Sequence, residues 1–305
     1  MKQVFIDGSA GTTGLRIRER LEKRNDIRLL ILSDEDRKDP EKRKALLKES
    51  DLAFLCLPDE AAREAAEWEE AKDTVLIDTS TAHRTSPGWV YGFPELIGKE
   101  KIASSRLIAN PGCHASGFLA LIAPLVKNGV LKKDARLSCT SLTGYSGGGK
   151  KMIAAYEAPA PDPLFAAPRL YALEQNHKHL KEMQAISGLE NAPAFLPIVA
   201  PFYSGMEVVV PVFQNDLCGG IKAVKDCYEK TYASGLVRFE SGSEEGFLSA
   251  SFFSGKDTMS VRVFGGEKRV LLTARFDNLG KGASGAAIQN MNLVFKLPEE
   301  TGLEL

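Results

Sequence analysis

The stretch Val4-Phe-Ile-Asp-Gly8-Ser-Ala-Gly-Thr-Thr-Gly14 decides the fold of the first part of the chain. An apolar, strand-like run leads into glycines at every third position, and an amphipathic, helix-like run (residues 15–24) and a second strand-like run (residues 28–32) follow. Glycines let the backbone approach a pyrophosphate, and a helix N-terminus offers amide donors. Because the loop lies between a strand and a helix, it predicts a nucleotide-binding unit rather than an ordinary turn. The residues expected to contact the cofactor here are Gly8, Ala10, Gly11, Thr12, Thr13 and Gly14.

The residues after the second strand-like run bear on which dinucleotide is bound. An acid at this point would hold a ribose 2′-hydroxyl, whereas a nearby basic residue can accept a 2′-phosphate. Ser33 comes first and Arg37 lies just beyond, which favours NADP(H). Asp34 is only one position further on, so NAD stays open.

The alternation of strand-like and helix-like runs continues as far as residue 78. Runs at residues 52–57 and 74–78 read as strands, and runs at residues 42–48 and 60–70 read as helices. Continuous apolar strands separated by helices indicate a parallel sheet with both faces covered. Ligands bind at the carboxyl ends of such strands, so we expect Pro58 and Ser80 on the cofactor edge.

The turn Asn110-Pro-Gly-Cys113 precedes an apolar run of helical length, residues 118–126. This order places Cys113 at or beside a helix N-terminus, where the helix dipole and unpaired amides favour a thiolate over a thiol. A thiolate is the form that covalent thiol chemistry needs. Taken alone, the position fits equally well a small buried residue that packs against the start of a helix.

Beyond this turn the strand-like runs become longer and alternate more, at residues 135–143, 194–200, 207–213, 260–264 and 269–276. They predict a second domain with a mostly antiparallel sheet. The fold class is therefore expected to be α/β, with a Rossmann-like parallel-sheet domain and an α+β substrate domain whose sheet is mixed or antiparallel. We expect the first domain to comprise residues 1–112 and 279–305, and the second to comprise residues 113–278. Asn278 would reach the cofactor if its segment folds back onto the first domain.

Composition excludes several classes of function. A formal net charge of -1, with basic and acidic residues interspersed, gives no support for nucleic-acid binding. No apolar run approaches the ~20 residues of a membrane span, and the early strand argues against a signal peptide. Five cysteines without paired spacing make a disulfide framework improbable, so we expect a cytoplasmic protein.

Other polar residues offer candidate sites. Arg84 either clamps a carboxylate or phosphate or lies on the surface. The run from Gly144 to Lys150 superficially matches a loop that binds nucleoside triphosphates, but that motif needs serine or threonine after its lysine, and this chain has Lys151. Ser146 and Lys150 could still line an anion-binding nest of backbone amides. His177 and His179 are two positions apart and would not share a helix face as zinc ligands do, so we expect no metal. One of them as a proton shuttle is the better interpretation.

Taken together, these motifs resemble the N-acetyl-gamma-glutamyl-phosphate reductases, in particular their shorter-chain type. The matching pieces, in family order, are Gly8-Ser-Ala-Gly-Thr-Thr-Gly14, Asp78-Thr-Ser-Thr-Ala-His-Arg84, Tyr91-Gly-Phe-Pro-Glu95, Asn110-Pro-Gly-Cys113, His177-Lys-His179 and Asn278-Leu-Gly-Lys-Gly-Ala-Ser-Gly285. The resemblance implies a phosphorylating aldehyde dehydrogenase of arginine biosynthesis that reduces an acyl phosphate with NADPH through a Cys113 thioester. His177 is preferred over His179 as the acid–base group by its place in the family motif. The predicted substrate and phosphate contacts are Arg84, Asn110, Ser146, Lys150 and His179.

The resemblance also implies a small-molecule substrate and a homo-oligomer, either a dimer or a tetramer. Three alternatives remain at this point. Aspartate-semialdehyde dehydrogenase uses the same chemistry on a shorter substrate that lacks the N-acetyl group. A cysteine hydrolase or phosphatase would leave the glycine loop unexplained, and position 119 holds leucine where a phosphatase loop needs arginine. The third is a catalytically silent NADP-binding sensor.

Overall fold

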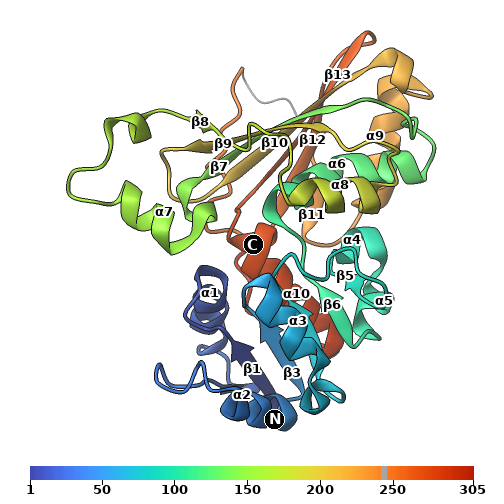
Figure 1. The fold of residues 1–305 in the computed structure, drawn as a ribbon. Coiled ribbons are helices and arrows are strands. Elements are labelled where there is room, and N and C mark those ends of the chain that lie inside the picture. The colour runs from blue at the N-terminus through green and yellow to red at the C-terminus, as the bar shows by residue number, and fades with distance from the viewer. Residues whose placement is uncertain (242–245) are drawn as a thin grey trace. The chain divides into compact units, whose positions relative to one another are not determined.

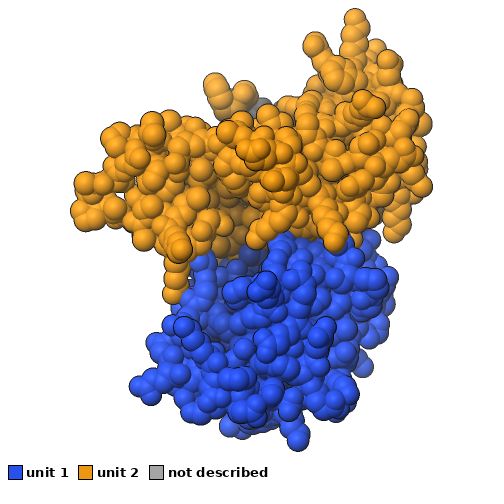
Figure 2. Space-filling view, in the orientation of Figure 1, with its two compact units in different colours: residues 1–111, 283–303 blue, residues 112–282, 304–305 orange. Residues whose placement is uncertain are grey.

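The computed structural model describes residues 1–241 and 246–305, which form two compact units (Figure 2). Unit 1 comprises residues 1–111 and 283–303, and unit 2 comprises residues 112–282 and 304–305. The chain thus leaves unit 1 directly before Gly112 and returns to it after Gly282. No helix in the described part of the chain is long and apolar enough to cross a membrane.

Unit 1 is built on a six-stranded sheet in which every pairing is parallel, as predicted (Figure 1). Its strand order, β2-β1-β3-β4-β6-β5, reverses direction between β1 and β3. In open parallel sheets this reversal point is where ligands bind, at the carboxyl ends of the strands. The strands are β1 (Lys2–Asp7), β2 (Ile27–Leu30), β3 (Leu52–Leu55), β4 (Val75–Asp78), β5 (Val90–Tyr91) and β6 (Leu107–Ala109).

Helices cover both faces of this sheet because successive apolar side chains of a strand point to opposite faces. Val4 and Ile6 enter one core cluster with side chains of α1 (Thr12–Leu21), α5 (Lys99–Ala103) and α10 (Gly285–Val294). Phe5 enters the other, with side chains of α2 (Pro40–Glu49) and α3 (Asp59–Glu67). The short elements η1 (Glu69–Ala71) and α4 (Pro94–Ile97) complete unit 1. The C-terminal helix is therefore part of the core of unit 1.

A buried ion pair lies directly before the glycine loop. Both carboxylate oxygens of Asp7 accept from Arg43 of α2, at 2.8 to 3.1 Å, and the guanidinium lies 4.7 Å from the ring centroid of Trp68. Burial raises the pKa of Asp7, while Arg43 acts in the opposite direction. The pair fixes the end of β1 against α2, where the loop begins.

Unit 2 contains a seven-stranded sheet in the order β11-β12-β13-β10-β7-β9-β8 (Figure 1). Four of its six pairings are antiparallel, whereas β7 pairs with β9 and β11 pairs with β12 in parallel. The sheet is therefore mixed, which confirms the predicted fold class. The strands are β7 (Ser138–Gly144), β8 (Arg169–Leu170), β9 (Ala194–Ala200), β10 (Met206–Phe213), β11 (Val237–Phe239), β12 (Met259–Gly265) and β13 (Arg269–Phe276).

Helix α6 (Cys113–Lys127) is the centre of unit 2 and is buried over nearly its whole length. It packs closely on the sheet at Gly117, where an added Cβ would lie 2.4 Å from a side-chain atom of Val208 on β10. Pro124 has no N–H for the carbonyl of Ala120, and the Tyr232 hydroxyl donates to that carbonyl instead at 2.6 Å. Helices α8 (His179–Ser187) and α9 (Gly220–Thr231) pack on α6.

Several short elements were not predicted from the sequence. α7 (Gly149–Tyr156) is short and begins inside the glycine run of residues 147–149, which is typical of a loop. Four more are single turns, for which periodicity gives no signal: η2 (Tyr145–Gly148), η3 (Pro163–Ala166), η4 (Gln214–Asp216) and the π-turn η5 (Gly280–Ser284). The π-turn lies between β13 and α10, at the point where the chain returns to unit 1.

Candidate active site

The glycine loop of unit 1 joins β1 to α1 in a conformation that excludes side chains at two of its glycines. Gly8 has φ +89°, and a Cβ there would lie 2.3 Å from the carbonyl oxygen of Cys56. A Cβ on Gly14 would lie 2.4 Å from the carbonyl oxygen of Gly8. The first turn of α1 contains no acidic residue, and no side chain caps it. This geometry suits the pyrophosphate of a dinucleotide, because the backbone can approach closely and the amides stay available.

The turn after β2 presents the residues predicted to distinguish NADP from NAD. Arg37 is about half exposed and its Nε lies 3.6 Å from the carboxylate of Asp34, itself 91% exposed. Ser33 Oγ accepts from the amide of Asp36. The exposed pairing of Arg37 is of the weak surface kind, so the guanidinium is available to an anion at little cost.

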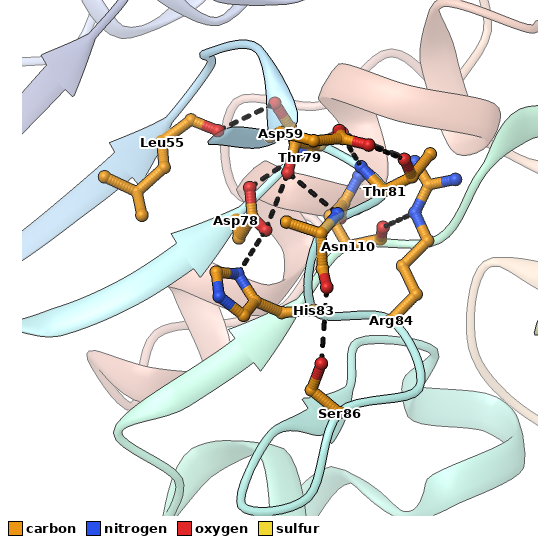
Figure 3. A network of polar contacts seen from close by, with 11 residues as sticks. Leu55, Asp59, Asp78, Thr79, Thr81, His83, Arg84, Ser86 and Asn110 are labelled. Carbon is orange, nitrogen blue, oxygen red and sulfur yellow. Dashed lines mark hydrogen bonds and ion pairs between the residues drawn. The ribbon is translucent and has the colours of Figure 1, made fainter. Parts of the chain in front are cut away.

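A polar network closes the carboxyl ends of β3, β4 and β6 (Figure 3). Asp78, at the end of β4, is fully buried and accepts from the backbone and hydroxyl of Ser80 at 2.8 and 2.9 Å. Its second oxygen lies 2.7 Å from Nδ1 of His83, whose ring stacks on Trp89 at 3.9 Å. Thr81 is held by the carboxylate of Asp59 in α3. Ser80 therefore lies at the predicted edge, with its hydroxyl fixed by Asp78.

Arg84 is buried in the same network rather than on the surface. Its Nε donates to the carbonyl of Asn110 at 3.0 Å and its Nη2 to the carbonyl of Thr79 at 3.3 Å (Figure 3). The side chain of Asn110 donates to the carbonyl of Ala283 and accepts from Asn290. Both residues thus stabilise the segment that leads from β6 into the cysteine turn.

Cys113 is the first residue of α6 in unit 2, as the sequence predicted. The helix has 15 residues, no acid in its first turn and no side-chain cap on Gly112, so its dipole stabilises negative charge at the cysteine. The amide of Gly112 donates to Glu182 of α8 at 3.2 Å. Gly282 lies against the cysteine, because a Cβ there would be 3.1 Å from Cβ of Cys113.

The two candidate histidines differ in their surroundings. His177 is partly buried, and its Nδ1 accepts from the amide of His179 at 3.2 Å. A nitrogen that accepts a hydrogen bond carries no proton, so neutral His177 holds its proton on Nε2. His179 is 5% exposed, and its Nε2 lies 3.9 Å from the Glu182 carboxylate. The two rings are 4.7 Å apart.

His114, which follows the cysteine, links these groups. Its ring centroid lies 5.7 Å from that of His177 and 5.5 Å from that of His179. Its Nδ1 is hydrogen-bonded to Ser141 of β7, and its Nε2 to the Tyr171 hydroxyl. His177 and His179 are therefore gathered around the buried imidazole of His114, which directly follows Cys113 at the start of α6.

Three of the remaining predicted residues lie elsewhere in unit 2. Asn278 donates from Nδ2 to Ser146 Oγ at 3.0 Å and accepts from the amide of Gly205 at 2.9 Å, and all three are buried. Lys150 is exposed in the first turn of α7. Among the described residues no group of three or more histidine, cysteine or carboxylate side chains could hold a metal ion.

Sequence reasoning missed four residues that surround the start of α6, namely His114, Tyr171, Glu182 and Gly282. Each comes close through tertiary structure, and no motif marks Tyr171 or Glu182. His114 offered a signal, since a histidine next to a nucleophile in a wholly apolar helix must be buried and therefore partnered.

Two family models match the chain, one on each side of the cysteine turn. The model described as the NAD binding domain of semialdehyde dehydrogenase matches residues 3–105. The model described as the semialdehyde dehydrogenase dimerisation domain matches residues 113–278. The second match begins at Cys113 itself.

Similar proteins extend the match over the whole chain. The N-acetyl-gamma-glutamyl-phosphate reductase 2 of Nostoc sp. is 42% identical over 321 residues, which cover 99% of both chains. The N-acetyl-gamma-glutamyl-phosphate reductase of Sinorhizobium medicae is 43% identical over 304 residues, covering 96% of this chain and 98% of its own. Among solved structures, aspartate semialdehyde dehydrogenase II of Vibrio cholerae superimposes with a TM-score of 0.71 at 21% identity, covering 97% of this chain and 99% of its own. The last similarity concerns the fold alone, whereas the sequence identities show that the chain belongs to the N-acetyl-gamma-glutamyl-phosphate reductases, a family of the semialdehyde dehydrogenases.

Proposed function

We propose that the protein reduces N-acetyl-L-glutamyl 5-phosphate with NADPH, giving N-acetyl-L-glutamate 5-semialdehyde and phosphate, as a step of L-arginine biosynthesis. The names of the relatives at 42–43% identity support the substrate and the reaction. The observation that carries the proposal is a cysteine at the N-terminus of α6, followed directly by His114, whose ring lies 5.7 Å from that of His177 and 5.5 Å from that of His179. An acyl-phosphate reductase requires a nucleophile and an acid–base group so arranged.

The residues of unit 1 fit NADP(H). A Cβ would collide with backbone atoms at Gly8 and Gly14, so the loop is shaped for close approach of a pyrophosphate. No acid follows β2 directly, and Arg37 is available for the 2′-phosphate. When bound, NADPH supplies the hydride. The proposed contacts in unit 1 are Gly8, Ala10, Gly11, Thr12, Thr13, Gly14, Ser33, Arg37, Pro58 and Ser80, and Asn278 is the proposed contact from unit 2.

Cys113 performs the covalent step. Its thiolate attacks the acyl carbon, the bond from that carbon to the phosphate oxygen breaks, and phosphate leaves a thioester on the enzyme. His177, in its protonated form, donates the Nε2 proton to the carbonyl oxygen as the thioester is reduced and becomes neutral. It takes the proton back when the C–S bond breaks, and this releases the semialdehyde and restores the thiolate. Such acid–base assistance typically contributes ~10²–10⁴-fold in rate.

We assign five residues to substrate and phosphate binding. Lys150 is an exposed cation in the first turn of a helix, where an anion is stabilised. His179 lies beside the proposed acid–base group, and Arg84 is a buried guanidinium near the cofactor edge of unit 1. Asn110 and Ser146 complete the set, and both are buried and hydrogen-bonded.

An assay in the reverse direction tests the activity. The protein should form NADPH from N-acetylglutamate semialdehyde only when phosphate is present, and should not act on aspartate semialdehyde. Activity on aspartate semialdehyde alone would identify an aspartate-semialdehyde dehydrogenase instead.

Cys113→Ser should bind NADPH normally without turnover, and substantial residual turnover would remove Cys113 from the mechanism. His177→Ala should lower kcat more than it raises KM, and the opposite pattern would make His177 a binding residue.

We also propose a homo-oligomer formed through unit 2 and a cytoplasmic location. The face of the seven-stranded sheet opposite the buried Val208, Val210 and Val212 carries Phe213, 60% exposed, and Leu271, 37% exposed. Exposed apolar side chains on one sheet face suit self-association. The cytoplasmic location is supported by the five cysteines, all of which are free thiols, as a reducing compartment maintains them. Light scattering on the purified protein should show a dimer or tetramer, and Phe213→Glu should shift it towards the monomer.

A further inference from the structure

The side chain of Gln175 takes the place of a main-chain partner at the edge of β9. β8 pairs antiparallel with β9, and just beyond its end the amide of Tyr171 donates to the carbonyl of Pro197 at 3.1 Å. In such a ladder every second residue presents its N–H and C=O to the same neighbour, so Phe195 presents both to this side. Gln175 Nε2 donates to the Phe195 carbonyl at 2.7 Å, and Oε1 accepts from the Phe195 amide at 2.9 Å. One side-chain amide thus continues the ladder past the end of β8.

The turn that brings Gln175 to this position has an unusual backbone. Ala172 has φ +51° and Gln175 has φ +54°, in the left-handed region that residues other than glycine seldom adopt. The amide of Gln175 donates to the carbonyl of Ala172 at 3.1 Å and closes the turn at residues 172–175. Strained conformations of this kind persist where surrounding contacts hold them, and they cluster at functional sites. The two hydrogen bonds to Phe195 are contacts that hold this turn.

His177 follows the turn, and its ring packs on the same phenylalanine. The ring centroids of His177 and Phe195 lie 5.2 Å apart in an edge-to-face arrangement. Phe195 is a fixed support, since it is 1% exposed and its main chain pairs with Cys139 of β7. The His177 ring also lies 5.7 Å from that of His114. The turn and the imidazole are therefore anchored on one residue of β9, the turn through Gln175.

We propose that Gln175 is a positioning residue for the acid–base group. Its pairing with the main chain of Phe195 fixes the turn at residues 172–175 and, two residues later, the direction of the His177 ring. The inference rests on the proposed function, in which His177 is the proton donor. Gln175 is an exposed residue, so its hydrogen bonds rather than its packing hold the turn. A displacement of about 1 Å at a reacting group can cost ~10²-fold in rate.

The test measures the two chemical steps separately. Thioester formation, read as a burst of phosphate from N-acetylglutamyl phosphate without NADPH, uses Cys113 in the proposed function. Reduction of the preformed thioester, read as NADPH oxidation in a single turnover, uses His177. Gln175→Ala should leave the burst rate and NADPH affinity unchanged and slow the reduction at least about tenfold. Equal losses in both steps would show a merely structural role and overturn the inference.

Gln175→Glu is the second variant. It keeps the size of the side chain and the acceptor for the Phe195 amide, but a carboxylate cannot donate to the Phe195 carbonyl, so the reduction should slow here too. The matched control is Gln184→Ala, which removes another glutamine amide that donates to a main-chain carbonyl, that of Glu190 at 2.8 Å. Both rates should stay unchanged in the control. A wild-type reduction rate in either Gln175 variant overturns the inference.

A double variant tests whether Gln175 acts through His177. In a His177→Ala background, Gln175→Ala should slow the reduction no further, because no imidazole remains to be positioned. Losses that multiply would overturn the inference. The proposed function fails separately: a wild-type reduction rate in His177→Ala would reject the acid–base assignment, and the positioning role with it. A slow His177→Ala together with unchanged Gln175 variants would reject the role of Gln175 alone.

Discussion

Lowering the pH should destabilise unit 2 because His114 is buried there as a neutral imidazole. Burial and the nearby His177 hold its pKa at about 3 in the folded protein, against about 6.5 for an unperturbed histidine. Between these values the unfolded chain binds a proton that the folded chain does not. Stability therefore falls as the pH falls through this window, beginning near the unfolded value.

The size of the effect follows from the shift. A displacement of about 3.5 units corresponds to about 5 kcal/mol, and the full loss is reached once the pH lies below the folded pKa of about 3. Between about pH 7 and about pH 5 the contribution of His114 to the loss of stability is about 2 kcal/mol. His114→Gln keeps a donor and an acceptor but cannot titrate, so this share of the pH dependence should disappear.

The assay must report on unit 2. Both tryptophans, Trp68 and Trp89, lie in unit 1, so their fluorescence follows the wrong unit. Hydrogen exchange of the α6 amides between about pH 5 and about pH 7, corrected for intrinsic exchange, gives the free energy of opening in unit 2. His83→Gln, in unit 1, is the control and should keep the wild-type slope in α6. Equal slopes in the wild type and His114→Gln would refute the reasoning.

Three other substitutions test the packing that supports the site. Tyr232→Phe removes the hydroxyl that donates to the Ala120 carbonyl of α6, for which Pro124 has no amide. The free energy of unfolding in urea should fall by about 1 kcal/mol. No change would mean that water donates to this carbonyl in the variant. Arg43→Met leaves the buried Asp7 carboxylate without its counter-ion and should lower the free energy of unfolding by about 3 kcal/mol. Adding Asp7→Asn to this variant should recover part of the loss. If the losses of the two single variants simply add, the pairing is contradicted. Gly282→Ala brings a Cβ to 3.1 Å from the Cβ of Cys113, so kcat should fall at least about tenfold while NADPH affinity stays unchanged. A wild-type kcat would show that the site accommodates the added methyl group without displacing Cys113.

The fold of unit 1 could be predicted because its signals are local. Strands such as residues 52–55 are continuous apolar runs. Gly8 and Gly14 occupy positions where a Cβ would collide with backbone atoms. The same holds for Cys113, since Pro111 and Gly112 cannot continue a helix and an apolar helical run follows. The predicted start of α6 is therefore confirmed.

The surroundings of the first residues of α6 could not be predicted because they depend on contacts between distant segments. Tyr171 is hydrogen-bonded to His114, which is 57 residues away in the sequence. Glu182 accepts from the amide of Gly112, which is 70 residues away. Strand order decides these contacts: β7 pairs in parallel with β9, and β8 is added at the edge. Periodicity identifies strands but carries no information on their order.

The most direct test of the central claim is a mass measurement on the intact protein. After mixing with N-acetylglutamyl phosphate in the absence of NADPH, one N-acetylglutamyl group per chain should be attached through a thioester, on the peptide that contains Cys113, with an equal amount of phosphate released. Addition of NADPH should then discharge the group as semialdehyde. Phosphate release without an adduct, or an adduct that persists in Cys113→Ser, would contradict the account.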